Sequence, residues 1–128
     1  MKKFLTFLAT ALLTAGAQAG QFPDISITEL KTVIESKQVT VIDVNGTESY
    51  KSGHIPGAID YAAHKAEIAK LLPADKGSLV VAYCGGPTCG AYAAAAKAAQ
   101  ALGYTNVKHL VAGISGWKAA KAPLEPAN

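Results

Sequence analysis

Hydrophobic residues along this chain fall into short β-branched runs that alternate with longer stretches of mixed apolar and polar residues. The clearest runs are residues 39–44, with an acid near their end, and residues 79–83. Apolar runs of this length, without strict alternation, are typical of strands buried on both faces of a parallel sheet. Two briefer runs predict further strands at residues 59–61 and 107–111.

The stretches between these runs predict helices. Residues 26–36 begin with Ser26, and Glu29 follows three residues later, which is the pattern of a capping box at a helix start. The alanine-rich stretch 90–102 has strong helix propensity. Shorter helices are predicted at residues 48–53, 62–72 and 114–121. Repeated strand–helix units indicate an α/β domain with helices on both faces of a parallel sheet.

The first residues form a basic tip and a short apolar run that ends in Ala17-Gln18-Ala19, the pattern of a secretory signal peptide. The run is shorter than the roughly 20 residues of a membrane-spanning helix, and no cysteine follows it to carry a lipid. We expect a signal peptide at residues 1–19, cleavage before Gly20, and a single domain at residues 20–128 with a flexible tail at 122–128. The mature protein is expected in the periplasm, with no stable membrane anchor.

The charge of the chain narrows the partners that it can have. The formal net charge is +3, and the predicted leader carries two of the lysines, which leaves +1 for the mature protein. No basic stripe interleaved with aromatic residues is present, so we expect no nucleic-acid partner. Every basic residue is lysine, and without arginine the chain cannot form a planar bidentate clamp for phosphate or carboxylate.

Cys84 directly follows the predicted strand at 79–83, and the loop 85–90 leads from it into the alanine-rich helix. Backbone N–H groups of such a loop and the positive end of the helix dipole converge near the sulfur and favour the thiolate. Cysteines in this setting can have pKa values of about 3.5–7.5, against about 8.5 for a free cysteine. Cys84 is therefore predicted to be a catalytic or redox-active sulfur.

A set of segments follows in order along the chain: residues 41–44 (Val-Ile-Asp-Val), Tyr50, residues 53–58 (Gly-His-Ile-Pro-Gly-Ala), residues 81–84 (Val-Ala-Tyr-Cys), residues 102–107 (Leu-Gly-Tyr-Thr-Asn-Val) and residues 110–117 (Leu-Val-Ala-Gly-Ile-Ser-Gly-Trp). In this order and at these spacings the chain resembles the rhodanese (sulfurtransferase) domain family. The resemblance implies a rhodanese-like fold, with a five-stranded parallel sheet flanked by helices. It also implies that Cys84 carries a persulfide between a sulfur donor and an acceptor.

The chemistry of a persulfide fits the predicted loop. The Cys84 thiolate would attack the outer sulfur of thiosulfate, a polysulfide or a protein persulfide, and the loop N–H groups would bind the anionic product without a cofactor. Glycine lets a bulky donor approach closely. We therefore expect these loop residues to bind the substrate: Gly85, Gly86, Pro87, Thr88 and Gly90. No spacing of histidine and cysteine matches a metal site, although His109 is a candidate for the pocket edge.

The loop departs from the family pattern in ways that bear on the donor. Many active rhodaneses place an arginine or lysine within or just after the loop, and Cys89 stands in that place here. Pro87 removes one backbone donor, and the Asp-x-Arg of the first conserved strand is Asp43-Val-Asn45. Because these changes weaken anion binding, we expect a polysulfide or a protein persulfide to be a better donor than thiosulfate.

Cys89 has two interpretations. One is a structural disulfide with Cys84, which an oxidising compartment favours. A bridge across so short a loop removes little chain entropy, less than the roughly 3 kcal/mol estimated for a loop of about 15 residues. The other is a resolving cysteine that attacks the Cys84 persulfide or sulfenate and releases reduced sulfur. A thiol acceptor or periplasmic reductant would then reset the pair.

Three functions remain open on the sequence. The predicted one is a periplasmic sulfurtransferase that uses Cys84, with Cys89 as a second catalytic cysteine. The alternatives are a thiol–disulfide redox protein that uses the same pair, and a non-catalytic rhodanese-like module that binds a protein partner. The complete Cys84 loop argues against the third, while the missing loop cation and the added cysteine keep the second open.

Overall fold

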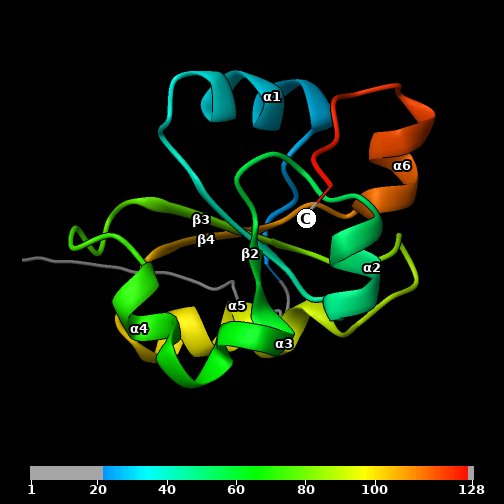
Figure 1. The fold of residues 1–128 in the computed structure, drawn as a ribbon. Coiled ribbons are helices and arrows are strands. Elements are labelled where there is room, and N and C mark those ends of the chain that lie inside the picture. Colours follow the sequence, from blue (N-terminus) through cyan, green and yellow to red (C-terminus); the bar gives the residue numbers. More distant parts are fainter. Residues whose placement is uncertain (1–21, 127–128) are drawn as a thin grey trace, which may run out of the picture.

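The strands of the domain form one parallel sheet in the order β2-β1-β3-β4. The computed structural model describes residues 22–126 (Figure 1). The strands are β1 (Thr40–Asp43), β2 (Ile59–Asp60), β3 (Leu79–Tyr83) and β4 (Asn106–His109). The two most apolar runs of the sequence, β1 and β3, lie at the centre of the sheet, where both faces are covered.

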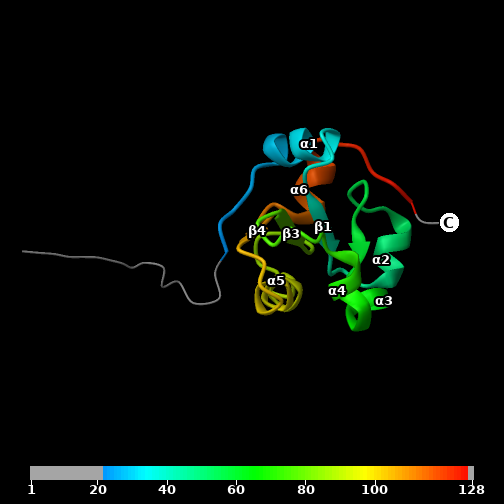
Figure 2. The same ribbon diagram turned by 90° about the vertical axis from the view of Figure 1, so that its left-hand side faces the viewer.

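Helices cover both faces of this sheet. They are α1 (Ile27–Glu35), α2 (Thr47–Ser52), α3 (Tyr61–His64), the short 3₁₀ turn η1 (Lys65–Glu67), α4 (Ile68–Leu71), α5 (Tyr92–Ala101) and α6 (Gly113–Ala119). Helices α1 and α6 lie on one face, and α3, α4 and α5 lie on the other (Figures 1 and 2). The predicted α/β class, a parallel sheet between two layers of helices, is confirmed.

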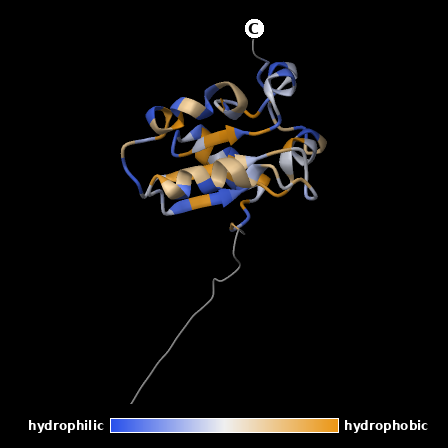
Figure 3. Ribbon diagram, turned by 90° about the horizontal axis from the view of Figure 1, so that it is seen from below, coloured by the Kyte–Doolittle hydropathy of each residue, from blue (hydrophilic) through white to orange (hydrophobic). Residues whose placement is uncertain are grey.

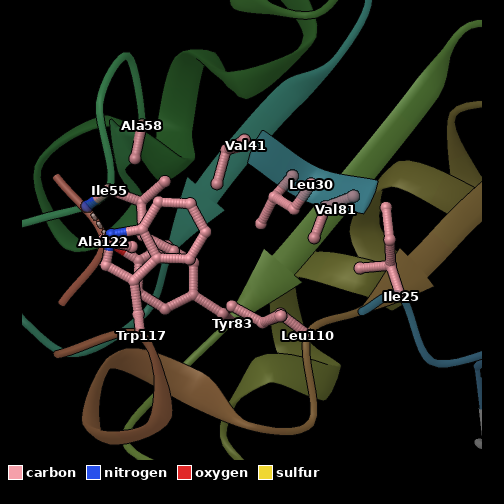
Figure 4. Packing of buried hydrophobic residues seen from close by; sticks show 10 residues of the cluster. All are labelled: Ile25, Leu30, Val41, Ile55, Ala58, Val81, Tyr83, Leu110, Trp117 and Ala122. Carbon is pink, nitrogen blue, oxygen red and sulfur yellow. Dashed lines mark hydrogen bonds between the residues drawn. The ribbon is translucent and has the colours of Figure 1, made fainter. Parts of the chain in front are cut away.

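Side chains of the central strands alternate between two hydrophobic cores, because neighbouring residues of a strand point to opposite faces. On β3, Val81 and Tyr83 belong to the core beneath α1 and α6, whereas Val80 and Ala82 belong to the core against α4 and α5. Figure 3 shows the hydrophobic residues along the strands, and Figure 4 shows the first core, where Trp117 of α6 lies close to Tyr83. The uninterrupted apolar runs of the sequence reflect this burial on two sides.

The start of α1 follows the predicted capping box. The hydroxyl of Ser26 accepts a 3.0 Å hydrogen bond from the backbone N–H of Glu29, and the Glu29 carboxylate accepts from the backbone N–H of Ser26 at 3.3 Å. These contacts satisfy two N–H groups that the first turn of a helix leaves without partners. The helix prediction at this position is confirmed.

The stretch predicted to be helical at residues 62–72 is helical up to Leu71, but it is divided into α3, η1 and α4. The backbone leaves helical values at His64 (φ −124°) and at Glu67 (φ −122°). This break turns Ile68 and Leu72 onto the sheet, where they are 6% and 7% exposed.

The edge of the sheet beside β4 carries an additional short pairing. The backbone N–H of Ile25 donates to the carbonyl of His109 at 3.1 Å, and the N–H of His109 donates to Pro23 at 2.8 Å. Asp24 and His109 form an isolated parallel bridge. Of the five strands expected from the resemblance, the described residues form four, and this bridge occupies the edge of β4 where another strand would pair.

Residues 122–126, the described part of the stretch expected to be a flexible tail, contact the rest of the domain. The indole N–H of Trp117 donates to the carbonyl of Pro123 at 2.6 Å. The backbones of His54 and Glu125 exchange two hydrogen bonds of 2.9 and 2.8 Å. Pro123 therefore supplies a carbonyl acceptor for the buried indole of Trp117.

The predicted signal peptide at residues 1–19 and the cleavage position before Gly20 lie outside the described residues. Within residues 22–126, no helix has the length and apolar character needed to cross a membrane.

Candidate functional site

Cys84 directly follows β3, at the edge of the sheet where the carboxyl ends of β1 and β3 meet. Asp43 and Tyr83 are paired in register at these ends, and the N–H of Val44 donates to the carbonyl of Tyr83 at 3.0 Å. Ligands of open parallel sheets bind at this edge. The side chain of Cys84 is only 1% exposed, so the predicted nucleophile lies beneath the loop that follows it.

Cys84 and Cys89 are joined by a disulfide bond. Their Cα atoms lie 6.3 Å apart, inside the range of about 4.4–6.8 Å that such bonds require. Cys89 is half-buried, whereas Cys84 is fully buried. The structure thus brings the two predicted catalytic sulfurs into direct contact and leaves Cys89 as the more accessible of the two.

A tight turn makes this contact possible. The backbone N–H of Cys89 donates a 3.1 Å hydrogen bond to the carbonyl of Gly86, with Pro87 and Thr88 at the tip of the turn. Proline is well suited to the second position of such a turn, because its φ is already near the required value. Its missing N–H therefore costs the loop no internal hydrogen bond.

Several N–H groups of the loop have no partner within the described part of the chain. They belong to Gly85, Gly86, Thr88 and Gly90, four of the five predicted substrate-binding residues. The fifth, Pro87, has no N–H. Backbone N–H groups that are not used by secondary structure can bind an anion near the cysteine. Of the predicted binding residues, Pro87 and Thr88 are exposed at the turn tip, and Gly85 and Gly86 are half-buried close to Cys84.

The first turn of α6 holds the loop in place. The N–H of Ile114 donates to the carbonyl of Cys84 at 2.9 Å, and the N–H of Ser115 donates to the carbonyl of Gly85 at 3.0 Å. At Gly113 the backbone has φ +64°, and a Cβ atom there would lie 2.5 Å from the nitrogen of Gly86. The sequence analysis did not identify this support, although Gly113, in the segment 110–117, was its signal.

A buried hydrogen-bond chain supports the strand end before Cys84. The hydroxyl of Tyr83 donates to Oδ2 of Asp43 at 2.5 Å and accepts from the N–H of Ile55 at 3.1 Å. The N–H of Asn45 donates to Oδ1 of Asp43 at 2.7 Å. Burial raises the pKa of Asp43. Burial, together with the hydrogen bond from the Tyr83 hydroxyl to Asp43, raises the pKa of Tyr83. Asp43 therefore serves as a buried acceptor of two hydrogen bonds at the end of β1.

A pocket of about 360 Å³ lies beside Cys89. Its lining residues are Phe22, Pro87, Thr88, Cys89, Gly90, Tyr92, His109 and Val111. The rings of Tyr92 and His109 are stacked with centroids 3.4 Å apart, and Phe22 meets Tyr92 edge-on at 6.2 Å. Three segments far apart in the sequence therefore build one aromatic wall next to the accessible sulfur.

His109 is the histidine that reaches this pocket. It is 5% exposed, and its Nε2 has no hydrogen-bond partner within residues 22–126. Burial lowers the pKa of His109, and the nearby charge of Asp24 partly opposes this. His54 instead donates from Nδ1 to the carbonyl of Tyr50 at 2.8 Å, away from the pocket. Among residues 22–126 no cluster of three or more histidine, cysteine, aspartate or glutamate side chains is arranged to hold a metal.

The chain matches the family model described as the rhodanese-like domain over residues 26–120. It is 30% identical over 105 residues to thiosulfate sulfurtransferase GlpE of Shewanella oneidensis, an alignment that covers 79% of this chain and 97% of that protein. It is 38% identical over 106 residues to the HTH-type transcriptional regulator Rv0324 of Mycobacterium tuberculosis, covering 80% of this chain. The chain spans only 46% of that regulator's length.

Solved structures share the same fold. The crystal structure of the BH2092 protein from Bacillus halodurans superimposes with a TM-score of 0.60 at 30% sequence identity. The similarity covers 81% of this chain and 77% of that one. The residues that the family model matches, 26–120, include both strands that meet at Cys84 and the helix α6 that supports the loop.

Proposed function

Because this chain belongs to the rhodanese-like domain family of sulfurtransferases, we propose that it moves sulfane sulfur through a persulfide on Cys84, with Cys89 as the resolving cysteine. One observation carries the proposal: Cys84 is buried at the carboxyl edge of the sheet and in bonding contact with Cys89, and the loop between them has N–H groups with no partner among residues 22–126. The loop favours an anionic sulfur at Cys84.

The first half-reaction loads Cys84. Its thiolate attacks the outer sulfur of the donor, a new S–S bond forms on Cys84, and the bond between the donor's two sulfurs breaks. The donor's remaining fragment leaves with the electron pair. The terminal sulfur of the persulfide carries the negative charge, and the N–H groups of Gly85 and Gly86 are the available donors closest in the chain.

The second half-reaction uses the reach of Cys89. In the disulfide, the sulfur of Cys89 is bonded directly to that of Cys84, so the loop lets the two sulfurs meet. The thiol of Cys89 gives up its proton to the outer sulfur of the persulfide and attacks the inner sulfur; the bond between Cys84 and the outer sulfur breaks, the disulfide forms and hydrosulfide leaves. An external thiol that takes the outer sulfur instead leaves Cys84 reduced.

The donor that suits this loop best is a polysulfide or a protein persulfide. Among residues 22–126 no lysine lines the pocket beside Cys89, and the chain contains no arginine. A small dianion such as thiosulfate would depend on backbone N–H groups alone, whereas a polysulfide chain or a peptide gains apolar contacts as well. We place this chemistry in the periplasm, a compartment that sustains disulfides, on the support of the signal-peptide pattern at residues 1–19.

The intact mass of the reduced mature protein, before and after brief exposure to polysulfide or thiosulfate, tests the proposal. We expect Cys89→Ser to retain one added sulfur atom and Cys84→Ser to retain none. Wild type should release hydrosulfide and end as the disulfide, two hydrogens lighter. Absence of any added sulfur on Cys89→Ser, with a folded protein, contradicts the proposal.

The disulfide itself favours a second candidate, a thiol–disulfide redox protein that handles no sulfane sulfur. In that case Cys89→Ser would abolish turnover and would gain no sulfur from any donor. A non-catalytic binding module would show a third result, because Cys84→Ser would then change no sulfur or redox reaction.

A further inference from the structure

The two sulfurs of the disulfide differ in accessibility. Cys84 is 1% exposed, whereas Cys89 is half-buried and follows the exposed turn tip at Pro87 and Thr88. A thiolate that opens a disulfide must reach one sulfur, and the other sulfur leaves. The structure offers an incoming thiolate only the Cys89 side.

A comparison of the two sulfurs as leaving groups also favours attack on Cys89. Exchange is faster when the departing thiol has the lower pKa. Cys84 would depart into the loop where the N–H groups of Gly85 and Gly86 have no partner within residues 22–126, so its thiolate gains hydrogen-bond donors on release. Cys89 would depart as a half-exposed thiolate at the end of the turn. Accessibility and leaving-group stability therefore agree.

The pocket beside Cys89 indicates the kind of thiol that reaches it. The volume of this pocket is about 360 Å³. Its wall is made by the aromatic rings of Phe22, Tyr92 and His109 together with Val111. Burial lowers the pKa of His109, so its imidazole is neutral at neutral pH, and the lining formed by residues 22–126 then carries no formal charge. A small zwitterionic thiol with two carboxylates finds no ionic partner there, whereas the apolar flank of a protein cysteine does.

We propose that a protein dithiol reductant docks on this pocket and attacks Cys89, forming a mixed disulfide there and releasing Cys84 as a thiolate. The proposal rests on the function proposed above and names the partner that resets the site.

The steps balance as follows. The first thiolate of the reductant forms a bond with the Cys89 sulfur, and the Cys84–Cys89 bond breaks with its electron pair on Cys84. The second thiol of the reductant loses its proton and attacks the sulfur of the reductant's first cysteine in the mixed disulfide. Cys89 then leaves and takes up a proton. The reductant ends as a disulfide, and two electrons have passed to the cysteine pair.

The sulfur that is attacked can be mapped on the wild-type protein. The oxidised mature chain is mixed with thioredoxin whose second active-site cysteine is replaced by serine, the reaction is quenched in acid, and free thiols are alkylated before peptide mapping. We expect thioredoxin on Cys89 and the alkyl group on Cys84. Thioredoxin bonded to Cys84 would overturn the proposal.

Docking is tested by placing a charge in the pocket wall. Val111→Asp should slow reduction by intact thioredoxin about tenfold and leave reduction by dithiothreitol within about twofold of wild type. Val39→Asp, another half-buried valine that lies outside this pocket, is the matched control. If glutathione reduces the wild-type disulfide as fast as thioredoxin at equal thiol concentration, or if the Val111 and Val39 variants react alike, no protein docks here.

These measurements contain no sulfur donor, so their failure is distinct from failure of the proposed function. Attack at Cys84 combined with sulfur gain by reduced Cys89→Ser would reject the docking proposal and keep the sulfurtransferase. Attack at Cys89 with no sulfur gain would keep the reductant site and leave a redox protein.

Discussion

The backbone N–H of Ile114 donates a 2.9 Å hydrogen bond to the carbonyl oxygen of Cys84, so the first turn of α6 lies directly on the cysteine loop. The neighbouring residue, Gly113, has φ +64°, and a Cβ atom there would lie 2.5–2.7 Å from three backbone atoms of residues 84–86. The geometry of the loop therefore depends on a helix that begins nearly thirty residues later in the chain.

Gly113→Ala should destabilise the domain and displace the loop. The left-handed backbone costs a residue with a Cβ about 1–2 kcal/mol, and the clash with the backbone of Gly86 adds about 1–3 kcal/mol. We expect a loss of about 2–5 kcal/mol in the free energy of unfolding, measured by urea denaturation. Reduced protein that still folds should also load sulfur on Cys84 more slowly.

Gly57→Ala is the matched control, because Gly57 also has a left-handed backbone, with φ +81°, but has open space at its Cβ position. It should lower the free energy of unfolding only by the cost of the left-handed backbone, about 1–2 kcal/mol, and leave the rate of sulfur loading on Cys84 unchanged. Equal losses of stability in the two variants would mean that the contact between α6 and the loop contributes nothing.

Tyr83→Phe should destabilise the domain by about 1–3 kcal/mol, because the N–H of Ile55 and Oδ2 of Asp43 each lose their hydrogen bond to the Tyr83 hydroxyl. Its matched control is Tyr61→Phe, since Tyr61 is half-buried and its hydroxyl makes no hydrogen bond within the described part of the chain. That variant should stay within about 0.5 kcal/mol of wild type in urea denaturation. Similar losses for the two would show that the buried chain adds no stability.

The strands could be predicted from the sequence because their signal is local. Residues 79–83 are apolar throughout, and both faces of β3 are covered by helices, so the run and the burial correspond directly. The capping box at Ser26 is equally local. The break within residues 62–72 could not be predicted, because the backbone at His64 and Glu67 follows the burial of Ile68 against the sheet rather than helix propensity.

The cysteine pair shows the same limit at the site. The spacing of Cys84 and Cys89 was consistent with a structural disulfide and with a resolving cysteine. Their Cα separation depends on the turn in which the N–H of Cys89 donates to the carbonyl of Gly86. The pocket beside them combines Phe22 before α1, Tyr92 in α5 and His109 in β4. No local pattern in the sequence marks residues that only the sheet topology brings together.

Stability should fall in mild acid because of His109. Its pKa is lowered below the ordinary value of 6.5, so between the lowered pKa and 6.5 the unfolded chain binds more protons than the folded one. The free energy of unfolding therefore rises with pH through this window. The contribution of His109 is fully present above pH 6.5 and is lost as the pH falls. His109→Phe, which retains a ring against Tyr92, should remove this part of the acid sensitivity in urea denaturation from about pH 5 to 8.

Asp24→Asn gives the companion test. The charge of Asp24 raises the pKa of His109, so its removal should lower that pKa further and extend the loss of stability to lower pH. The asparagine oxygen can still accept from the N–H of Val111, now at 3.0 Å from the carboxylate. An unchanged pH profile in both variants would assign the acid sensitivity to other groups.

Cys89→Lys should improve the use of thiosulfate. Cys89 stands where many rhodaneses carry a cation, and its sulfur lies in bonding contact with that of Cys84. An ammonium at this half-buried position adds about 1 kcal/mol of attraction for a dianion, so KM for thiosulfate should fall about fivefold relative to Cys89→Ser. Because the attraction is partly exposed to solvent, added salt should reduce the difference. Equal KM values for the two variants, at any salt concentration, would show that the missing loop cation does not limit binding of the donor.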